Sequence, residues 1–255
     1  MIARKKRNQI IECLNYLKLP GIKDTFEESI GLAEKEGLSY ENFLLHLLEH
    51  ETDVRNNNKI NRLLHNSGLP SGKTLNTFDM KRLPLKVKQK VNSITDGGFI
   101  DRKENILAFG KPGCGKTHLL CAIAYEQIIK GKKILFTTCS ILVQKLLIAK
   151  RDLQLEKILK KLSKYEAVII DDIGYVQQDR DEMEVLFTFL AHRYEKGSLM
   201  ITSNLSFSKW DKIFKDPMTT AAAIDRIVHH SIILELNNVQ SYRTENALKN
   251  KTMEV

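Results

Sequence analysis

The sequence lacks any run of apolar residues as long as the roughly 18 that a membrane-spanning helix requires. The basic segment at residues 1–7 is not followed by the apolar stretch and cleavage site of a secretion signal. Cysteines number four and none has Cys-x-x-Cys spacing, so neither a zinc cluster nor a disulfide framework is indicated. We therefore expect a cytoplasmic protein without a membrane partner.

The charge of the chain is unbalanced, which bears on the kind of partner to expect. Lysine and arginine number 40 against 31 aspartate and glutamate residues, so the formal net charge is +9. An excess of positive charge favours an anionic partner, above all nucleic acid, although many soluble proteins share it without binding one. Hydrophobic residues make up 42% of the 255 residues, which is enough for a substantial core.

A phosphate-binding loop is the strongest single motif in the sequence. It follows a short apolar run at 105–109, which is typical of a buried strand, and it precedes a helix-like stretch at 117–130. In such a loop the backbone N–H groups point at the phosphates, Lys116 reaches the β and γ oxygens, and Thr117 holds Mg²⁺. The sequence therefore predicts ATP or another nucleoside triphosphate as ligand, with Mg²⁺. The predicted loop consists of Gly110, Lys111, Pro112, Gly113, Cys114, Gly115, Lys116 and Thr117.

Two further expected strands end in residues suited to triphosphate chemistry. One apolar run leads into Asp171 and Asp172, the pattern of a Walker B strand. This pattern predicts that Asp171 holds Mg²⁺ together with Thr117, and that Asp172 orients or deprotonates the attacking water. Another run leads to Asn204, whose amide can hydrogen-bond the γ-phosphate and the water. An asparagine alone is more typical of a turn, and it is the two other motifs that favour a catalytic role.

Apolar periodicity separates a helical N-terminal part from an α/β core. Residues 8–64 have helical spacing, broken near Pro20 and Gly37, and turn-forming residues at 66–85 indicate a linker. From residue 86 onward strands alternate with helices, which predicts an α/β fold with a parallel five-stranded sheet and helices on both faces. The predicted boundaries are 1–68 for a small α-helical domain, 69–90 for the linker, 91–245 for the core and 246–255 for a tail.

One helix of the N-terminal part has apolar residues at helical spacing, which predicts a single buried stripe. Packing within a small helical module is a sufficient reason for such a stripe, and no cofactor needs to be invoked. The residues are Tyr40, Phe43, Leu44, Leu47 and Leu48.

Together these motifs resemble the AAA+ ATPases, in which the position of Asn204 is called sensor I, and among them the IstB-type helper ATPases of bacterial insertion sequences. DnaC-type helicase loaders and, more distantly, the initiator DnaA are relatives of that family. The resemblance implies a P-loop AAA+ core, and side-by-side assembly on DNA with ATP at the subunit junctions. It covers nearly the whole chain and includes residues 17–21, 77–79, 169–175, 192–197, 201–205, 225–231 and 241–243.

The resemblance also implies that an arginine of one subunit completes the ATP site of its neighbour. Arg226 matches this position, where a guanidinium supplied in trans would neutralise charge in the transition state. Arg193 and Arg243 are the alternative arginines, and a local ion pair of Arg226 with Asp225 or Glu235 is the structural alternative. Because 12 residues follow Arg243, we expect no C-terminal lid domain of the usual AAA+ kind.

A basic segment between residues 141 and 164 is the expected DNA-binding surface, because the same part of initiator-type AAA+ proteins lines the path of the nucleic acid. It has few acidic residues and no interleaved aromatic ones, which favours phosphate contacts to duplex DNA over base stacking. A solvated surface helix is the alternative. The residues are Lys145, Lys150, Arg151, Lys157, Lys160, Lys161 and Lys164, and smaller basic clusters lie at 4–7 and 81–90.

These features predict an ATP-hydrolysing regulator that assembles as a homo-oligomer on double-stranded DNA. The resemblance implies that it promotes transposition by delivering or activating target DNA for the transposase of the same element, in the bacterial cytoplasm and near the nucleoid. Asp172 stands where most AAA+ proteins have glutamate, so we expect slow, regulatory hydrolysis. A DnaC-like helicase loader is the alternative, although some loaders carry an N-terminal zinc cluster that this sequence lacks.

Overall fold

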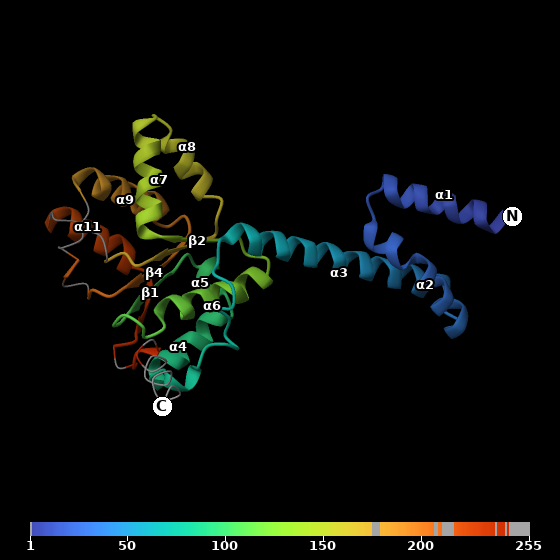
Figure 1. Cartoon of the computed structure of the whole chain (residues 1–255), viewed down its shortest axis with the longest axis horizontal. Helices are drawn as coiled ribbons and strands as arrows, with labels where there is room; N and C mark the ends of the chain where they lie inside the picture. The colour runs from blue at the N-terminus through green and yellow to red at the C-terminus, as the bar shows by residue number, and fades with distance from the viewer. Residues whose placement is uncertain are drawn as a thin grey trace, which may run out of the picture. The chain divides into compact units, whose positions relative to one another are not determined.

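The computed structural model describes residues 2–174, 179–206, 209–210, 217–237, 239–242 and 244. The chain divides into two compact units, Met1–Arg62 and Leu63–Val255, which are described separately (Figure 1). None of the described helices is long and apolar enough to cross a membrane.

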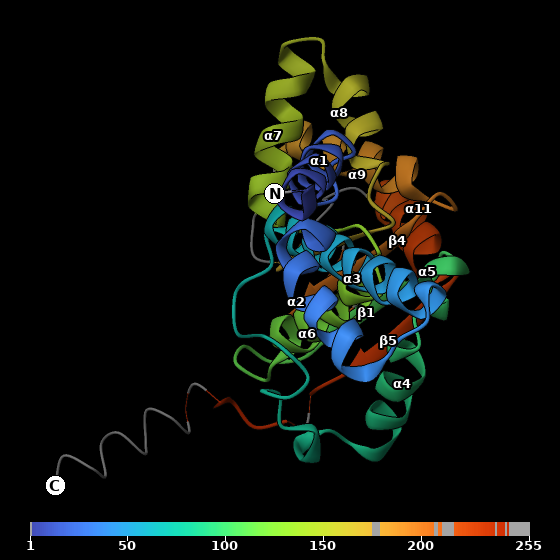
Figure 2. The ribbon, with the colours of Figure 1, turned by 90° about the vertical axis from the view of Figure 1, so that its right-hand side faces the viewer.

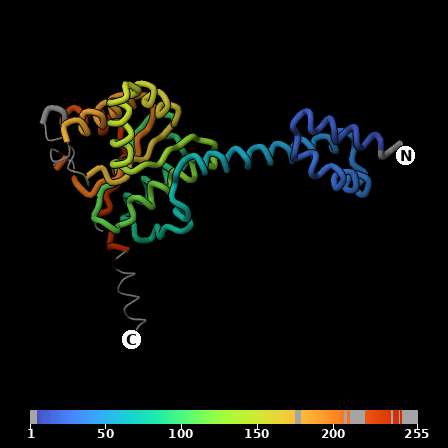
Figure 3. Tube along the Cα trace, turned by 45° about the horizontal axis from the view of Figure 1, so that its top comes forward, coloured from blue at the N-terminus to red at the C-terminus, as the bar shows by residue number. Residues whose placement is uncertain are grey.

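The first unit is helical, as predicted, and is the blue part of the chain in Figure 3. Pro20 occupies the first turn of a helix, where its fixed φ and missing N–H are tolerated, and Gly37 ends that helix with φ +64°. The Ser39 hydroxyl then accepts the N–H of Asn42, so it caps the next helix. The helices are α1 (Ile2–Tyr16), α2 (Pro20–Glu36) and α3 (Tyr40–Ser67), the last of which runs past the division between the units.

The predicted apolar stripe at the start of α3 is wrong. Leu47 is buried and Phe43 packs beside it, but Tyr40 is 95% exposed, and Leu44 and Leu48 are also exposed. The five residues span a wide arc of the helix, and α1 and α2 cover only the side on which Phe43 and Leu47 lie. Helical periodicity shows which residues share a face, but not how much of that face another element covers.

The second unit is built on a sheet whose five strands are all parallel, in the order β2-β3-β4-β1-β5. The prediction of a parallel five-stranded α/β fold is therefore confirmed. The strands are β1 (Asn105–Phe109), β2 (Ile134–Thr138), β3 (Ala167–Asp171), β4 (Ser198–Ser203) and β5 (Ser231–Glu235). The helices are η1 (Met80–Arg82), α4 (Leu85–Thr95), α5 (Gly98–Asp101), α6 (Lys116–Ile129), α7 (Cys139–Arg151), α8 (Leu155–Leu162), α9 (Arg180–Arg193) and α11 (Pro217–Val228).

Helices cover both faces of the sheet, because successive strand residues point to opposite sides. On β1, Ile106 and Ala108 pack in a core with α4 and α6, whereas Leu107 and Phe109 pack in a second core with α7, α9 and α11. Both faces are thus dry, which is why the strands are continuous apolar runs.

The connector expected before the core packs against it. Phe78 and Leu83 are buried, as is Val87 at the start of α4, and all three belong to the core that contains α6. These residues therefore form part of the second compact unit, which begins at Leu63. The domain boundaries deduced from the sequence stay a prediction.

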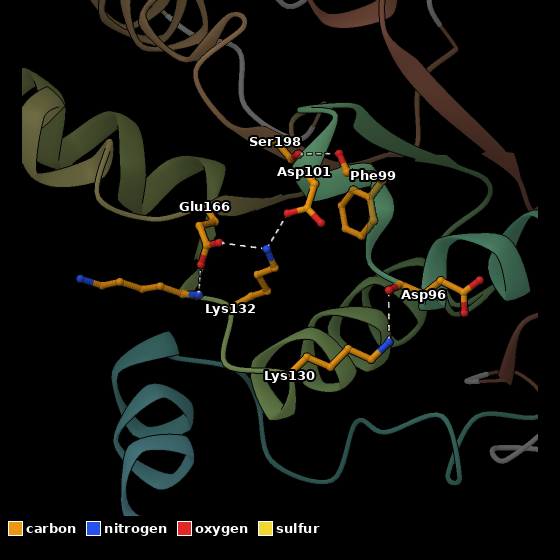
Figure 4. Close-up of polar contacts among 8 residues, drawn as sticks. Asp96, Phe99, Asp101, Lys130, Lys132, Glu166 and Ser198 are labelled. Atoms are coloured by element: carbon orange, nitrogen blue, oxygen red, sulfur yellow. Dashed lines mark hydrogen bonds and ion pairs between the residues drawn. The ribbon is translucent and has the colours of Figure 1, made fainter. Parts of the chain in front are cut away.

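Ion pairs fix the amino edge of the sheet near β2 and β3 (Figure 4). The Lys132 ammonium lies 2.6 Å from an Asp101 carboxylate oxygen and 3.3 Å from Glu166. The other oxygen of Glu166 accepts the backbone N–H of Lys133 at 2.8 Å. Single exposed pairs of this kind stabilise little, but a shared lysine ties three separate segments together.

Candidate functional site

The carboxyl edge of the sheet brings the predicted motifs together. Strands β3, β4 and β1 are neighbours, so the segments that follow them meet at one place. A cavity of about 480 Å³ opens there. It is lined by Lys73, Thr77, Phe78, Pro112, Gly113, Gly115, Lys116, Thr117, His118, Asp172, Asn204 and Tyr242.

The phosphate loop wraps around the amino end of α6, where unpaired N–H groups favour an anion. Gly115 has φ +96°, and a side chain there would meet the Phe78 ring at 3.0 Å, so glycine is required. The Lys116 ammonium is buried and donates to the carbonyls of Gly110 at 2.8 Å and Lys111 at 3.1 Å. A buried cation whose described partners are carbonyl oxygens alone fits a polyanionic ligand.

Oxygen atoms suited to Mg²⁺ lie beside the loop. The Thr117 hydroxyl donates to a carboxylate oxygen of Asp171 at 2.8 Å, and the buried Thr202 hydroxyl donates to the same oxygen at 2.7 Å. Hydroxyl and carboxylate oxygens are the ligands that Mg²⁺ prefers. The pair predicted from the sequence to hold the metal is therefore in contact, with Thr202 orienting the carboxylate.

Asp172 and Asn204 face the same cavity as the phosphate loop. Asp172 has φ +58°, and its N–H donates to the Thr202 hydroxyl at 2.8 Å, which fixes the turn after β3. Asn204 lies against Gly174, where a Cβ would come within 2.7 Å of its Oδ1 atom. The structure thus brings together Lys116 and these two polar residues from three strand ends.

An aromatic end of the cavity was missed by the sequence reasoning. The Phe78 ring meets His118 edge-on at 5.2 Å between centroids and Tyr242 at 6.4 Å. The Tyr242 N–H donates to the carbonyl of Gly113 at 3.0 Å, and the Arg82 guanidinium lies 4.0 Å above the tyrosine ring. Such a surface suits a flat base. The signal lay in segments 77–79 and 241–243, but only folding brings them to the loop.

His118 lies at this aromatic end in a partly buried position. Its Nε2 atom is 3.1 Å from the Thr77 hydroxyl and 3.3 Å from the Thr74 carbonyl. Burial, with the positive charge of Lys73, lowers the pKa of His118 below its ordinary value. The imidazole is therefore neutral at physiological pH and available as a hydrogen-bonding group.

Arg226 lies at the opposite edge of the sheet from the phosphate loop. The Asn105 amide, at the first residue of β1, donates to the carbonyl of Ile227 at 2.9 Å, whereas the loop begins after Phe109, the last residue of β1. A five-residue strand separates its ends by roughly 13 Å. In the described part of the chain the Arg226 guanidinium lies 4.9 Å from the Phe187 ring, and its Nη1 atom has no hydrogen-bond partner.

Arg193, one of the alternative arginines, is a buried structural residue. It is 1% exposed, and burial lowers its pKa to about 10, so the group stays charged at neutral pH. Its guanidinium cannot reach another subunit without leaving the core. Arg243 lies outside the described residues. The Arg193 guanidinium donates to the carbonyls of Leu162, Tyr165, Glu166 and Ser198.

The seven basic residues expected to contact DNA lie on or next to α7 and α8, but they are not equivalent. Four have no ion-pair partner in the part of the chain that the structure describes: Lys145, Lys157, Lys161 and Lys164. Three have carboxylate partners: Lys150 with Asp181 and Glu184, Arg151 with Asp152, and Lys160 with Glu156. Because four lysines recur three or four residues apart, one shallow surface contains Lys157, Lys160, Lys161 and Lys164.

The fold occurs in solved structures of DNA replication proteins. The DnaC helicase loader superposes with a TM-score of 0.56 at 17% identity, covering 67% of this chain and 98% of that one. AMPPCP-bound DnaA from Aquifex aeolicus superposes with a TM-score of 0.57 at 16% identity, covering 74% of this chain and 57% of that one. With the phosphate loop at the end of β1, the chain has the AAA+ fold of these two proteins.

The family follows from sequence comparison. The chain belongs to the IstB-like ATP binding protein family, whose model matches residues 12–250. An insertion-sequence ATP-binding protein of Sinorhizobium fredii is 43% identical over 93% of this chain and 80% of its own length. The ATP-binding protein of insertion sequence IS5376 from Geobacillus stearothermophilus is 38% identical over 93% of this chain and 94% of its own length.

Proposed function

We propose that the protein is a slow ATPase that assembles as a homo-oligomer on duplex DNA and delivers or activates target DNA for the transposase of its insertion sequence. The separation of Arg226 from the phosphate loop carries this proposal, because the two lie at opposite edges of one sheet. The relatives belong to insertion sequences, which supports a transposase as partner. The unpaired lysines near α8 support duplex DNA as the surface on which assembly occurs.

In this proposal the residues of the cavity divide the work of hydrolysis. Bound ATP and Mg²⁺ supply the phosphoanhydride and the metal charge that polarises it. With ATP and Mg²⁺ bound, Lys116 would exchange its two loop carbonyls for phosphate oxygens, and Thr117 and Asp171 would hold the metal. Asn204 would orient the attacking water and Asp172 would accept its proton, while the water oxygen bonds to the γ-phosphorus and the bond to the β–γ bridging oxygen breaks, so that ADP leaves.

The arrangement of edges explains why assembly and hydrolysis would be coupled. A head-to-tail contact places the amino edge of one subunit against the carboxyl edge of the next, and such a contact continues into rings or filaments. Arg226 of one subunit then reaches the phosphates of the other and neutralises charge in the transition state. Bound ATP would hold the junction, and hydrolysis would release it.

Electron microscopy of the protein with duplex DNA tests the proposal. We expect rings or filaments with ATP, and none with ADP or with Lys116→Ala, because the substitution removes the cation that contacts the phosphates. Lys130→Ala is a matched control, since this lysine follows the other end of α6 and donates to backbone carbonyls at 95 and 96. Assembly that is identical with ADP and ATP would refute the nucleotide switch.

A further inference from the structure

An exposed leucine stands at the tip of the α7–α8 hairpin. The two helices lie side by side and extend away from the sheet (Figures 1 and 2). Leu153, in the short turn between them, is 91% exposed. Its φ is +56°, in the left-handed region that leucine rarely adopts.

The backbone at this tip has the geometry of a helix end that normally calls for glycine. The N–H of Gln154 donates to the carbonyl of Ala149 at 2.7 Å, and the N–H of Leu153 donates to Lys150 at 3.2 Å. This pair of hydrogen bonds is the Schellman motif, whose left-handed position is usually glycine. Helix α6 ends with the same pair of bonds, and there the position is Gly131, with φ +87°.

Leu153 is therefore unfavourable in two ways. The backbone at this position favours glycine. An apolar side chain that stays exposed to water also adds no hydrophobic stabilisation to the fold. The described part of the chain has four other non-glycine residues with positive φ, and all are polar: Lys18, Lys103, Asp172 and Glu195. The stability of the free protein gives no reason for leucine at this tip, so we look for the reason in a complex.

The charges along the α8 arm, beyond the Arg151–Asp152 ion pair that precedes the tip, indicate the partner. The unpaired lysines Lys157, Lys161 and Lys164 lie along the α8 arm of the same hairpin. A row of lysines matches the regular phosphates of a duplex, and an apolar tip matches the stacked bases between its strands. Duplex DNA offers both surfaces side by side.

We propose that Leu153 is a wedge that enters the minor groove and inserts between base pairs while the α8 lysines hold the backbone, so that each subunit bends the duplex. This inference rests on the proposed binding of duplex DNA. Apolar wedges of this kind unstack one step and kink the DNA, and they need no specific sequence. Leu153 would then be the residue that deforms the target DNA.

The first test separates stability from function. Leu153→Gly removes the left-handed strain, so we expect the thermal midpoint of the second unit to rise by about 2–4 °C. Leu153→Met keeps an apolar side chain and the strain, so its midpoint should match that of the wild type. A midpoint that falls in Leu153→Gly would overturn the argument that leucine is unfavourable here.

The second test measures bending on a duplex labelled with a donor and an acceptor at its two ends, much shorter than the persistence length of about 150 bp. With saturating protein and ATP, we expect Leu153→Gly to lose at least half of the wild-type increase in energy transfer. Its affinity, measured by anisotropy, should stay within about threefold, since phosphate contacts dominate binding. Leu153→Met and the control Ile129→Ala, an exposed apolar residue at the end of α6, should bend DNA normally.

The outcomes distinguish this inference from the function on which it rests. If Leu153→Gly bends the duplex as well as the wild type, the wedge is wrong while DNA binding stands. If the wild type binds the duplex without any change in energy transfer, the wedge is wrong as well. If the wild type does not bind duplex DNA at all, both the wedge and the proposed function fail.

Discussion

At the scale of single residues, Arg193 shows how a charge can serve the fold rather than the chemistry. Its two terminal nitrogens donate to four backbone carbonyls near the amino ends of β3 and β4. Gly197 leaves room for this guanidinium, since a Cβ at that position would lie 2.7 Å from the Cζ atom. The Arg193 guanidinium therefore links the segments at the start of β3 and β4 by hydrogen bonds.

Replacing Arg193 should therefore unfold the protein more easily rather than impair the ATP site alone. We expect Arg193→Met to lower the free energy of unfolding by about 3 kcal/mol, because buried carbonyls lose their donors. Arg102→Met is the control, since Arg102 is exposed and its ion pair with Glu104 is screened by solvent. Urea unfolding followed by Trp210, the single, fully buried tryptophan, measures both. Equal stability of Arg193→Met and wild type would contradict the structural role.

At the scale of elements, α8 has two different faces. Leu155, Leu159 and Leu162 pack into the core that contains α7 and α9, while the lysines face outward. The separation follows from helical spacing, since apolar and basic residues each recur three or four positions apart. The core side fixes the helix, and the outer side is exposed to solvent.

The lysine face makes a prediction about the salt dependence of DNA binding. Lys157→Gln combined with Lys161→Gln should reduce the slope of log affinity against log salt by about 2, because two phosphate contacts are lost. Lys150→Gln should leave the slope unchanged, since Lys150 is engaged by Asp181 and Glu184. Fluorescence anisotropy over a range of salt concentrations measures each slope. Equal slopes for all variants would place the DNA elsewhere on the molecule.

At the scale of the whole molecule, the proposed assembly requires one subunit to hold two halves of different ATP sites. The phosphate loop and Asp171 lie at the carboxyl edge of the sheet, and Arg226 is tied to the amino edge through the Asn105–Ile227 hydrogen bond. A variant damaged at one edge keeps the other edge intact. Two such variants can therefore complement each other only if the site is shared between subunits.

Mixing Lys116→Ala with Arg226→Ala tests this sharing. Neither variant should hydrolyse ATP alone, but in an equal mixture about a quarter of the junctions combine an intact loop with an intact arginine. We expect a corresponding recovery of phosphate release. Mixing Lys116→Ala with Asp171→Asn is the control. Both changes damage the same edge, so no junction in this mixture has an intact carboxyl edge. Absence of recovery in the first mixture would argue against a trans role for Arg226.

Local features were predictable because local chemistry determines them. The strand expected at 105–109 is β1, and the expected parallel sheet has five strands, since a strand buried on both faces must be a continuous apolar run. The phosphate loop is similarly determined by its own glycines and by Lys116, whose contacts lie within the loop. The breaks at Pro20 and Gly37 follow from backbone conformations that these residues prefer.

The features that only the tertiary structure decided depend on segments far apart in the chain. Tyr242 and Phe78 meet beside the phosphate loop, Arg193 is buried while Arg226 is not, and three of the five residues of the apolar stripe on α3 are exposed. Composition and spacing cannot distinguish these cases, because burial depends on which other element covers a side chain. The sequence by itself therefore determined an ATP-binding α/β protein with its loop and its strands. The tertiary structure decided which charges are locked in the core and which remain at the surface, since desolvation and contact are properties of the packed molecule.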